Sequence, residues 1–340
     1  MSIIKDSLYG FVIGDAMGVP IEFKSREYLK KNPVASMIGY GSYNIPNGVW
    51  SDDTSLTLAT IDSIIVNNGK IKYNHIADCF CEWMNHAKYT ATGEVFDIGI
   101  TTKYALFKYS VLKGDATKCG GIKISENGNG SLMRMLPIAW YCYFNNLNNE
   151  NILDVVWNTS AITHAHEISI MGCYIYVRYL LFLLEKKNKF EAYQEIQKLN
   201  YNAFSKETQE VYQKILKTNI QKLSLNDIKS SGYIVDTLEA VLWIILNNNS
   251  FNESIICAIN LGEDTDTIGA ISGSISGLLY GYNSINKEWI NDLKRKELLD
   301  KYIYDFDKLI NIKNWEKHSI FFSIGVNNTP ILLFFIIYIR

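Results

Sequence analysis

The stretch Asn260–Gly281, NLGEDTDTIGAISGSISGLLYG, begins with closely spaced oxygen side chains and continues as a run of small and apolar residues. The run from Ile268 to Gly281 carries no charge and predicts a buried helix. Carboxylates this close together repel one another unless positive charge lies among them, and a helix start supplies only a little of it. Hard oxygen ligands of this kind suit Mg²⁺ or Mn²⁺, so the stretch suggests a metal site.

A second oxygen-rich cluster strengthens this interpretation. Taken alone, Asp and Thr before a helix are most often caps that bind backbone N–H groups. Far upstream, however, Trp50–Thr57 reads WSDDTSLT, which again places acids and hydroxyls before an apolar helical run. We therefore expect two oxygen-rich helix starts to face each other across one site.

Composition excludes several classes of protein. The 340 residues suffice for one large domain or two, and 48% hydrophobic with 20% charged residues is typical of a globular core. The net charge is −2 and no basic block is present, so we expect no nucleic-acid partner. Lys5 and Asp6 interrupt the first apolar stretch, which argues against a signal peptide.

The cysteines and the C-terminal end bear on localisation. Six cysteines without CxxC spacing indicate free thiols in a reducing compartment, so we expect a cytoplasmic protein. Pro330–Arg340, PILLFFIIYIR, is very apolar but far shorter than the ~20 residues that span a bilayer. A buried final strand or helix is a better interpretation than a membrane anchor, and an exposed, aggregation-prone tail stays open.

Helical periodicity recurs along the chain, whereas hairpin signals and βαβ alternation are scarce. We expect an irregular loop at 33–50 and a single all-α domain with a central helix at 172–184. Gly10 and Gly14 lie four residues apart, which predicts close approach of another backbone. The expected helices lie at 2–18, 56–66, 75–86, 97–112, 131–141, 151–187 (two helices hinged near 163–166), 232–246 and 287–310.

Four further features could contribute to a site. Glu22 and Asp97 each lie among apolar residues, although a surface position and an N-cap are the respective alternatives. The glycine-dense segment 114–130 precedes a predicted helix, and such loops bind anions through converging backbone N–H groups. Of His164 and His166, one could cap a helix while the other is buried.

Seven segments, in order, resemble the ADP-ribosylglycohydrolase family. They are GDAMGVPIEF (14–23), WSDDTSLTLA (50–59), FDIGITT (96–102), GNGSLMRMLPIA (128–139), THA (163–165), GYIVDTLEA (232–240) and LGEDTDTIGAISGSISGLLYG (261–281). The resemblance suggests a family domain at 1–310 and a C-terminal extension of unknown role at 311–340. It implies an all-α orthogonal bundle whose central cleft holds two divalent cations, Mg²⁺ or Mn²⁺.

The resemblance also implies roles for individual residues. The implied metal ligands are Ser51, Asp52, Asp53, Asp264, Asp266 and Thr267. The family often has Thr at the position of Ser51, and Ser keeps the hydroxyl oxygen. The implied catalytic acids are Glu22, near the metals, and Asp97, in the substrate pocket. The implied diphosphate contacts are Gly128, Asn129, Gly130, Ser131 and His164, and Tyr233 is a candidate adenine or ribose contact.

The activity implied is metal-dependent hydrolysis at C1″ of ADP-ribose attached to a protein side chain or a small molecule, without nucleic-acid or membrane partners. Glu22 or Asp97 would move the proton. The alternatives are a non-catalytic ADP-ribose or nucleotide binder on the same fold, a dinuclear phosphoester hydrolase and a structural helical protein with acidic caps. The linkage stays open among arginine, serine, poly-ADP-ribose and O-acetyl-ADP-ribose.

Overall fold

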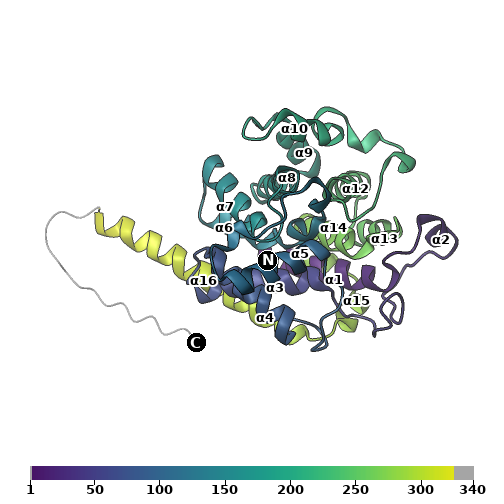
Figure 1. The fold of residues 1–340 in the computed structure, drawn as a ribbon, viewed down its shortest axis with the longest axis horizontal. Helices are drawn as coiled ribbons and strands as arrows, with labels where there is room; N and C mark the ends of the chain where they lie inside the picture. The colour runs from purple at the N-terminus through teal and green to yellow at the C-terminus, as the bar shows by residue number, and fades with distance from the viewer. Residues whose placement is uncertain (1, 325–340) are drawn as a thin grey trace.

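The computed structural model describes residues 2–324, with side chains as far as Ile312. These residues contain no β-strand, only isolated bridges between Gly121 and His164 and between Gly128 and Tyr233, which confirms the all-α prediction (Figure 1). The helices are α1 Ile3–Gly18, α2 Arg26–Lys31, α3 Asp52–Val66, α4 Tyr73–His86, α5 Ile100–Leu112, α6 Leu136–Phe144, α7 Asn149–Ala161, α8 Glu167–Leu184, α9 Lys189–Lys198, α10 Lys206–Val211, α11 Gln213–Lys217, α12 Ile234–Asn247, α13 Phe251–Ile259, α14 Thr265–Tyr280, α15 Lys287–Asp292 and α16 Lys296–Ile324. Among the 3₁₀ helices are η1 Val19–Ile21 and η4 Asn129–Arg134.

Helices α1 and α14 pack backbone against backbone. A Cβ added to Gly14 would lie 1.9 Å from the carbonyl oxygen of Gly269, and one added to Gly10 would lie 2.2 Å from that of Gly273. Neither space admits a side chain, which is why the two helices meet at glycines. The close approach predicted from the glycine spacing is therefore confirmed, and its partner is the stretch that begins at Asn260.

Helix α8 runs through the core, as the sequence predicted for its apolar segment. Every residue from Ile168 to Leu184 is buried. Among the described residues it is the one helix whose length and composition would suit a membrane span, yet 89% of that window is buried inside the protein. An apolar helix covered by other helices has the character of a core element.

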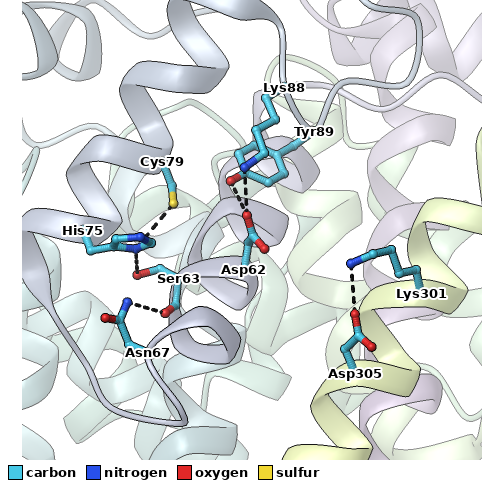
Figure 2. A network of polar contacts seen from close by, with 9 residues as sticks. All are labelled: Asp62, Ser63, Asn67, His75, Cys79, Lys88, Tyr89, Lys301 and Asp305. Carbon is cyan, nitrogen blue, oxygen red and sulfur yellow. Dashed lines mark hydrogen bonds and ion pairs between the residues drawn. The ribbon is translucent and has the colours of Figure 1, made fainter.

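Polar contacts hold α3 against the segment that follows α4 (Figure 2). Asp62 of α3 accepts hydrogen bonds from Lys88 Nζ at 3.0 Å and from Tyr89 Oη at 2.7 Å. The carbonyl of Tyr89 in turn accepts the indole N–H of Trp50 at 3.1 Å. Because Trp50 directly precedes Ser51, the N-cap of α3, this network links the start of α3 to the segment after α4.

Two predicted helix starts differ from the structure. Asp97 lies in a loop with φ +51°, and α5 begins at Ile100 with Gly99 as its N-cap, so the interpretation of Asp97 as a cap is wrong. The expected helix at 131–141 is divided into η4 and α6. Pro137, in the first turn of α6, lacks the N–H that a continuous helix would need there.

Helix α16 continues without a break past residue 310 to Ile324, and in Figure 1 its yellow end projects beyond the neighbouring helices. The apolar segment Pro330–Arg340 lies outside the described residues. The boundary between the family domain at 1–310 and the C-terminal extension at 311–340 stays a prediction.

Candidate active site

Buried and half-buried carboxylates from three helices and the loops between helices gather at one place. The close packing of α1 on α14 places Asp15 beside the start of α14, where Asp266 lies. The start of α3 supplies Asp52 and Asp53 to the same place. The full set is Asp15, Glu22, Asp52, Asp53, Asp97, Asp264 and Asp266.

Two groups of three carboxylates have the spacing of metal ligands. In the first, one oxygen each of Asp15, Asp53 and Asp266 lie within 4.8 Å of one another. In the second, the same holds for Glu22, Asp97 and Asp266. Asp266 belongs to both groups, so the two lie side by side.

Asp15 was not among the residues proposed from the sequence. Its Oδ1 accepts the backbone N–H of Ser51 at 2.9 Å, and its Oδ2 accepts the N–H of Thr54 at 3.0 Å. Asp15 therefore caps α3 from another helix. The sequence feature that could have indicated Asp15 is the presence of an acid in the otherwise apolar second half of α1, directly after Gly14.

The two oxygen-rich helix starts face each other, as the sequence predicted. Thr267 of α14 donates its hydroxyl proton to Asp53 Oδ2 of α3 at 3.2 Å, and Ser51 Oγ donates to the same oxygen at 3.3 Å. The other oxygen of Asp53, Oδ1, and Oδ1 of Asp266 are buried without a hydrogen-bond partner. Buried acceptors without a donor from the protein are typical of sites that bind water or a cation.

Glu22 is buried, so the alternative of a surface glutamate is wrong. Tyr43 donates to Glu22 Oε2 at 2.7 Å, which leaves Oε1 free of that bond. Phe23 N donates to the carbonyl of Glu263 at 2.7 Å, and Glu263 N donates to that of Lys24 at 2.8 Å. This pairing aligns the turn after η1 with the segment that leads into α14.

Burial raises the pKa of every carboxylate in the cluster, because the charged form loses its hydration. The pKa of Asp15 is raised to about 6, and that of Glu22 to about 9 with a further contribution from the charge of Asp97. In the described part of the chain, no lysine or arginine forms an ion pair with these acids. A divalent cation would supply the missing positive charge, so the donor set fits one.

The glycine loop lies beside the acids. Asn129 Nδ2 donates to Asp264 Oδ2 at 2.6 Å and to Thr237 Oγ1 of α12 at 3.0 Å. The loop is tied to the segment before α12 by a hydrogen bond from Asn129 N to the carbonyl of Gly232 at 3.0 Å. Through this pairing Gly128 lies next to Tyr233. The side chain of Asn129 therefore orients a carboxylate of the cluster.

The hydroxyl of Ser131 points into the interior. It accepts a hydrogen bond from Ser160 Oγ at 3.0 Å and lies 3.3 Å from Cys173 Sγ. Any contact of Ser131 with a bound ligand would therefore involve its backbone.

His164 is buried and His166 caps α8, which matches the expectation of one buried and one capping histidine. Arg134 donates to Thr163 Oγ1 at 2.7 Å, and that hydroxyl lies 2.8 Å from His164 Nδ1. Thr163 Oγ1 accepts a proton from the guanidinium of Arg134 and can donate its own proton to Nδ1 of His164, so both contacts are hydrogen bonds. Burial and the charge of Arg134 lower the pKa of His164 to about 3, so the ring is neutral, and the contact with Thr163 favours the tautomer with its proton on Nε2.

His164 faces the glycine loop. A Cβ added to Gly130 would lie 2.9 Å from His164 Cε1 and 3.5 Å from its Nε2, and one added to Gly128 would lie 3.7 Å from Nε2. The neutral ring of His164 and the two glycines, Gly128 and Gly130, thus border the same space. A neutral N–H donor suits a polar or anionic group.

An all-α domain with a carboxylate cluster beside a glycine loop defines the class to which this protein belongs. The model of the family described as ADP-ribosylglycohydrolase matches residues 2–316. The chain belongs to the ADP-ribosylglycohydrolase family and is a hydrolase of that class.

Named relatives and a solved structure agree with this placement. The chain is 31% identical to the ADP-ribosylarginine hydrolase Tri1 of Serratia proteamaculans, over 86% of this chain and 75% of that protein. It is 26% identical to the ADP-ribosyl-[dinitrogen reductase] glycohydrolase of Rhodospirillum rubrum, over 84% and 88% of the two chains. An ADP-ribosylglycohydrolase-related protein complex shares the fold, with a TM-score of 0.75 and 22% identity over 91% of this chain and 98% of that one.

Proposed function

We propose that this enzyme hydrolyses the bond between C1″ of ADP-ribose and an arginine side chain of a protein, with two divalent cations, Mg²⁺ or Mn²⁺. The observation that carries the proposal is the pair of carboxylate groups that share Asp266. The arginine linkage is supported by the relatives named as ADP-ribosylarginine hydrolases, which are 31% identical to this chain.

The cluster fits two cations. One would be held by Asp15, Asp53 and Asp266, and the other would lie on the opposite side of Asp266, next to Glu22 and Asp97. The hydroxyls of Ser51 and Thr267 and the carboxylates of Asp52 and Asp264 lie in the same cluster and would complete the ligand set. When bound, such cations lower the pKa of coordinated water and stabilise developing negative charge.

Glu22 is the better placed of the two candidate bases. Bound cations would lower the pKa of Glu22, which is raised to about 9 in the cluster alone, so that Oε1 could accept the proton of a water that attacks C1″ while the hydroxyl of Tyr43 holds Oε2. The bond from C1″ to the guanidine nitrogen then breaks, its electron pair stays on nitrogen, and the leaving guanidine takes up a proton. Asp97, whose carboxylate lies within 4.8 Å of those of Glu22 and Asp266, would help to deliver that proton.

The diphosphate would bind at the glycine loop. His164 Nε2–H faces Gly128 and Gly130 and would donate to a phosphate oxygen without adding charge. Tyr233, which pairs with Gly128, would contact the adenosine part of the ligand. Asn129 would act by holding Asp264 in place.

A substrate panel tests the proposal. Release of ADP-ribose is measured from a peptide ADP-ribosylated on arginine, from one modified on serine, from poly-ADP-ribose and from O-acetyl-ADP-ribose, each with Mg²⁺ and with EDTA. The proposal predicts cation-dependent release from the arginine peptide at the highest kcat/KM. Binding of the arginine peptide without release would instead support a non-catalytic ADP-ribose binder, and phosphate release from a phosphoester would support the rival hydrolase.

A further inference from the structure

Helix α5 presents an apolar face to the outside of the protein. Its buried side is formed by Thr102, Ala105, Leu106 and Tyr109. The opposite side carries four exposed apolar residues at helical spacing, Ile100, Tyr104, Phe107 and Val111. At 3.6 residues per turn these four form one stripe along the helix. Contiguous exposed apolar surface of this kind commonly marks an interaction site.

The first residue of the stripe, Ile100, lies three residues after Asp97 of the candidate active site. Tyr43, whose hydroxyl binds Glu22, packs its ring 6.4 Å from that of Phe23 and 5.0 Å from that of Phe96. Phe23 is 68% exposed, and Phe96 directly precedes Asp97 in the loop that leads into α5. We call Phe23, Tyr43, Phe96 and the four-residue stripe of α5 the docking track.

The charges on α5 itself have one sign, while the neighbouring segments also carry Glu94 and, beside Lys123, Glu126. Lys103 and Lys108 are exposed on opposite flanks of the stripe, and α5 contains no acid. Exposed Lys123 lies between two exposed isoleucines, Ile122 and Ile124, in a loop beside the helix, since a Cβ on Gly121 would come within 2.9 Å of Thr101. A partner that covers this surface would need apolar residues together with acidic ones.

We propose that the docking track binds the polypeptide that carries the ADP-ribosyl-arginine group, through a segment rich in apolar and acidic residues. The inference rests on the proposed function. A polypeptide whose modified side chain lies in the cluster would run past Glu22 and Asp97, beside which Tyr43 and Phe96 of the docking track lie. A second copy of this chain on the same surface would cover that path. The 13 residues of α5 extend ~20 Å, a length that about six extended residues would cover.

Three substrates test the proposal at fixed Mg²⁺. The first is free ADP-ribosylarginine, which cannot reach the docking track. The second is a peptide with one central ADP-ribosylated arginine flanked by Leu, Phe and Glu. The third is a peptide of equal length with Gly and Ser flanks. We expect the wild-type enzyme to cleave the apolar, acidic peptide with about 10-fold higher kcat/KM than the Gly and Ser peptide.

The variant Tyr104→Ser/Phe107→Ser removes the centre of the stripe without introducing charge. Both residues are exposed, so the fold should tolerate the change. Tyr304→Ser on α16 is the matched control, because Tyr304 is 66% exposed against 71% for Tyr104. We expect the preference between the two peptides to fall to about 2-fold in the double variant and to persist in the control, with free ADP-ribosylarginine cleaved as by wild type.

The possible outcomes separate the two proposals. If wild type cleaves both peptides with equal kcat/KM, the docking proposal is wrong while the hydrolase assignment stands. The same conclusion follows if the double variant loses kcat/KM for free ADP-ribosylarginine as much as for the peptides. A change from dimer to monomer in the double variant, measured by sedimentation, identifies the surface as an interface between copies and also overturns the docking proposal. If none of the three substrates is cleaved, the proposed function itself is wrong.

Discussion

Gly14 of α1 and Gly269 of α14 touch so closely that neither position has room for a methyl group. A Cβ on Gly14 would lie 1.9 Å from the carbonyl oxygen of Gly269, and a Cβ on Gly269 would lie 2.3 Å from that of Gly14. Asp15 directly follows the first glycine, and Asp266 lies three residues before the second. The contact that holds the two helices together therefore also sets the distance between two carboxylates of the cluster.

Gly14→Ala should destabilise the fold and weaken cation binding together. A methyl group cannot enter against the backbone of α14 without separating the helices, and overpacking of this kind costs about 1–3 kcal/mol or more. Chemical denaturation with and without Mg²⁺ measures both effects. Gly99→Ala is the control, because the nearest atom to its Cβ lies 3.7 Å away and its φ is −57°. Wild-type stability in Gly14→Ala would refute the close contact.

Asp266→Asn should remove the carboxylate that both groups share while keeping the shape of the side chain. We expect a loss of hydrolysis on the order of 100-fold and a smaller rise of Tm on addition of Mg²⁺ or Mn²⁺. Differential scanning fluorimetry and an ADP-ribose release assay measure the two quantities. Asp305→Asn, on α16 and away from the cluster, should leave both unchanged. Full activity in Asp266→Asn would argue against the shared ligand.

Without divalent cations, the stability of the protein should fall as the pH rises. Burial raises the pKa of Asp15 from 3.8 to about 6 and that of Glu22 from 4.5 to about 9, so the folded chain holds protons that the unfolded chain has released. This stabilisation is complete at a pH below the pKa values of the unfolded chain. It is lost as the pH rises through the pKa values of the folded chain. In EDTA, Tm should therefore decrease from pH 5 to pH 9, and saturating Mg²⁺ should flatten the decrease. A Tm in EDTA that rises over this range would contradict the buried cluster.

Thr163→Val should impair substrate binding through His164. The valine cannot donate to Nδ1, so the ring loses the contact that fixes the proton on Nε2. We expect KM for the arginine peptide to rise about 10-fold with a smaller change in kcat, which corresponds to the loss of one hydrogen bond. Thr163→Ser should restore KM because it keeps the hydroxyl. In ¹⁵N spectra the wild-type ring should show a protonated Nε2, and a proton on Nδ1 would contradict the assignment.

Local sequence patterns predicted the elements whose signals lie in a few adjacent residues. The apolar run after Asp266 and the oxygen-rich start at Ser51 predicted two helix starts that face each other, and the bond from Thr267 to Asp53 confirms it. Gly10 and Gly14 likewise predicted a close backbone contact.

Three other contacts between distant segments were not predicted. Asp15 joins the cluster only because α3 begins beside it, and no local pattern specifies that neighbour. The amide of Asn129 donates to Asp264 because its loop pairs with Gly232, and no pattern within the loop indicates that partner. The hydrogen bond from Tyr43 to Glu22 joins the loop at 33–50 to the turn after η1, and no pattern within either segment indicates it.

The most direct test of the account combines cation binding with turnover. Protein freed of metal with EDTA and dialysed is titrated with Mn²⁺, and bound metal and ADP-ribose release from the arginine peptide are measured on the same samples. The account predicts two Mn²⁺ per chain, no turnover before addition and turnover that appears as the two sites fill. Full hydrolysis by protein that holds no metal would contradict it.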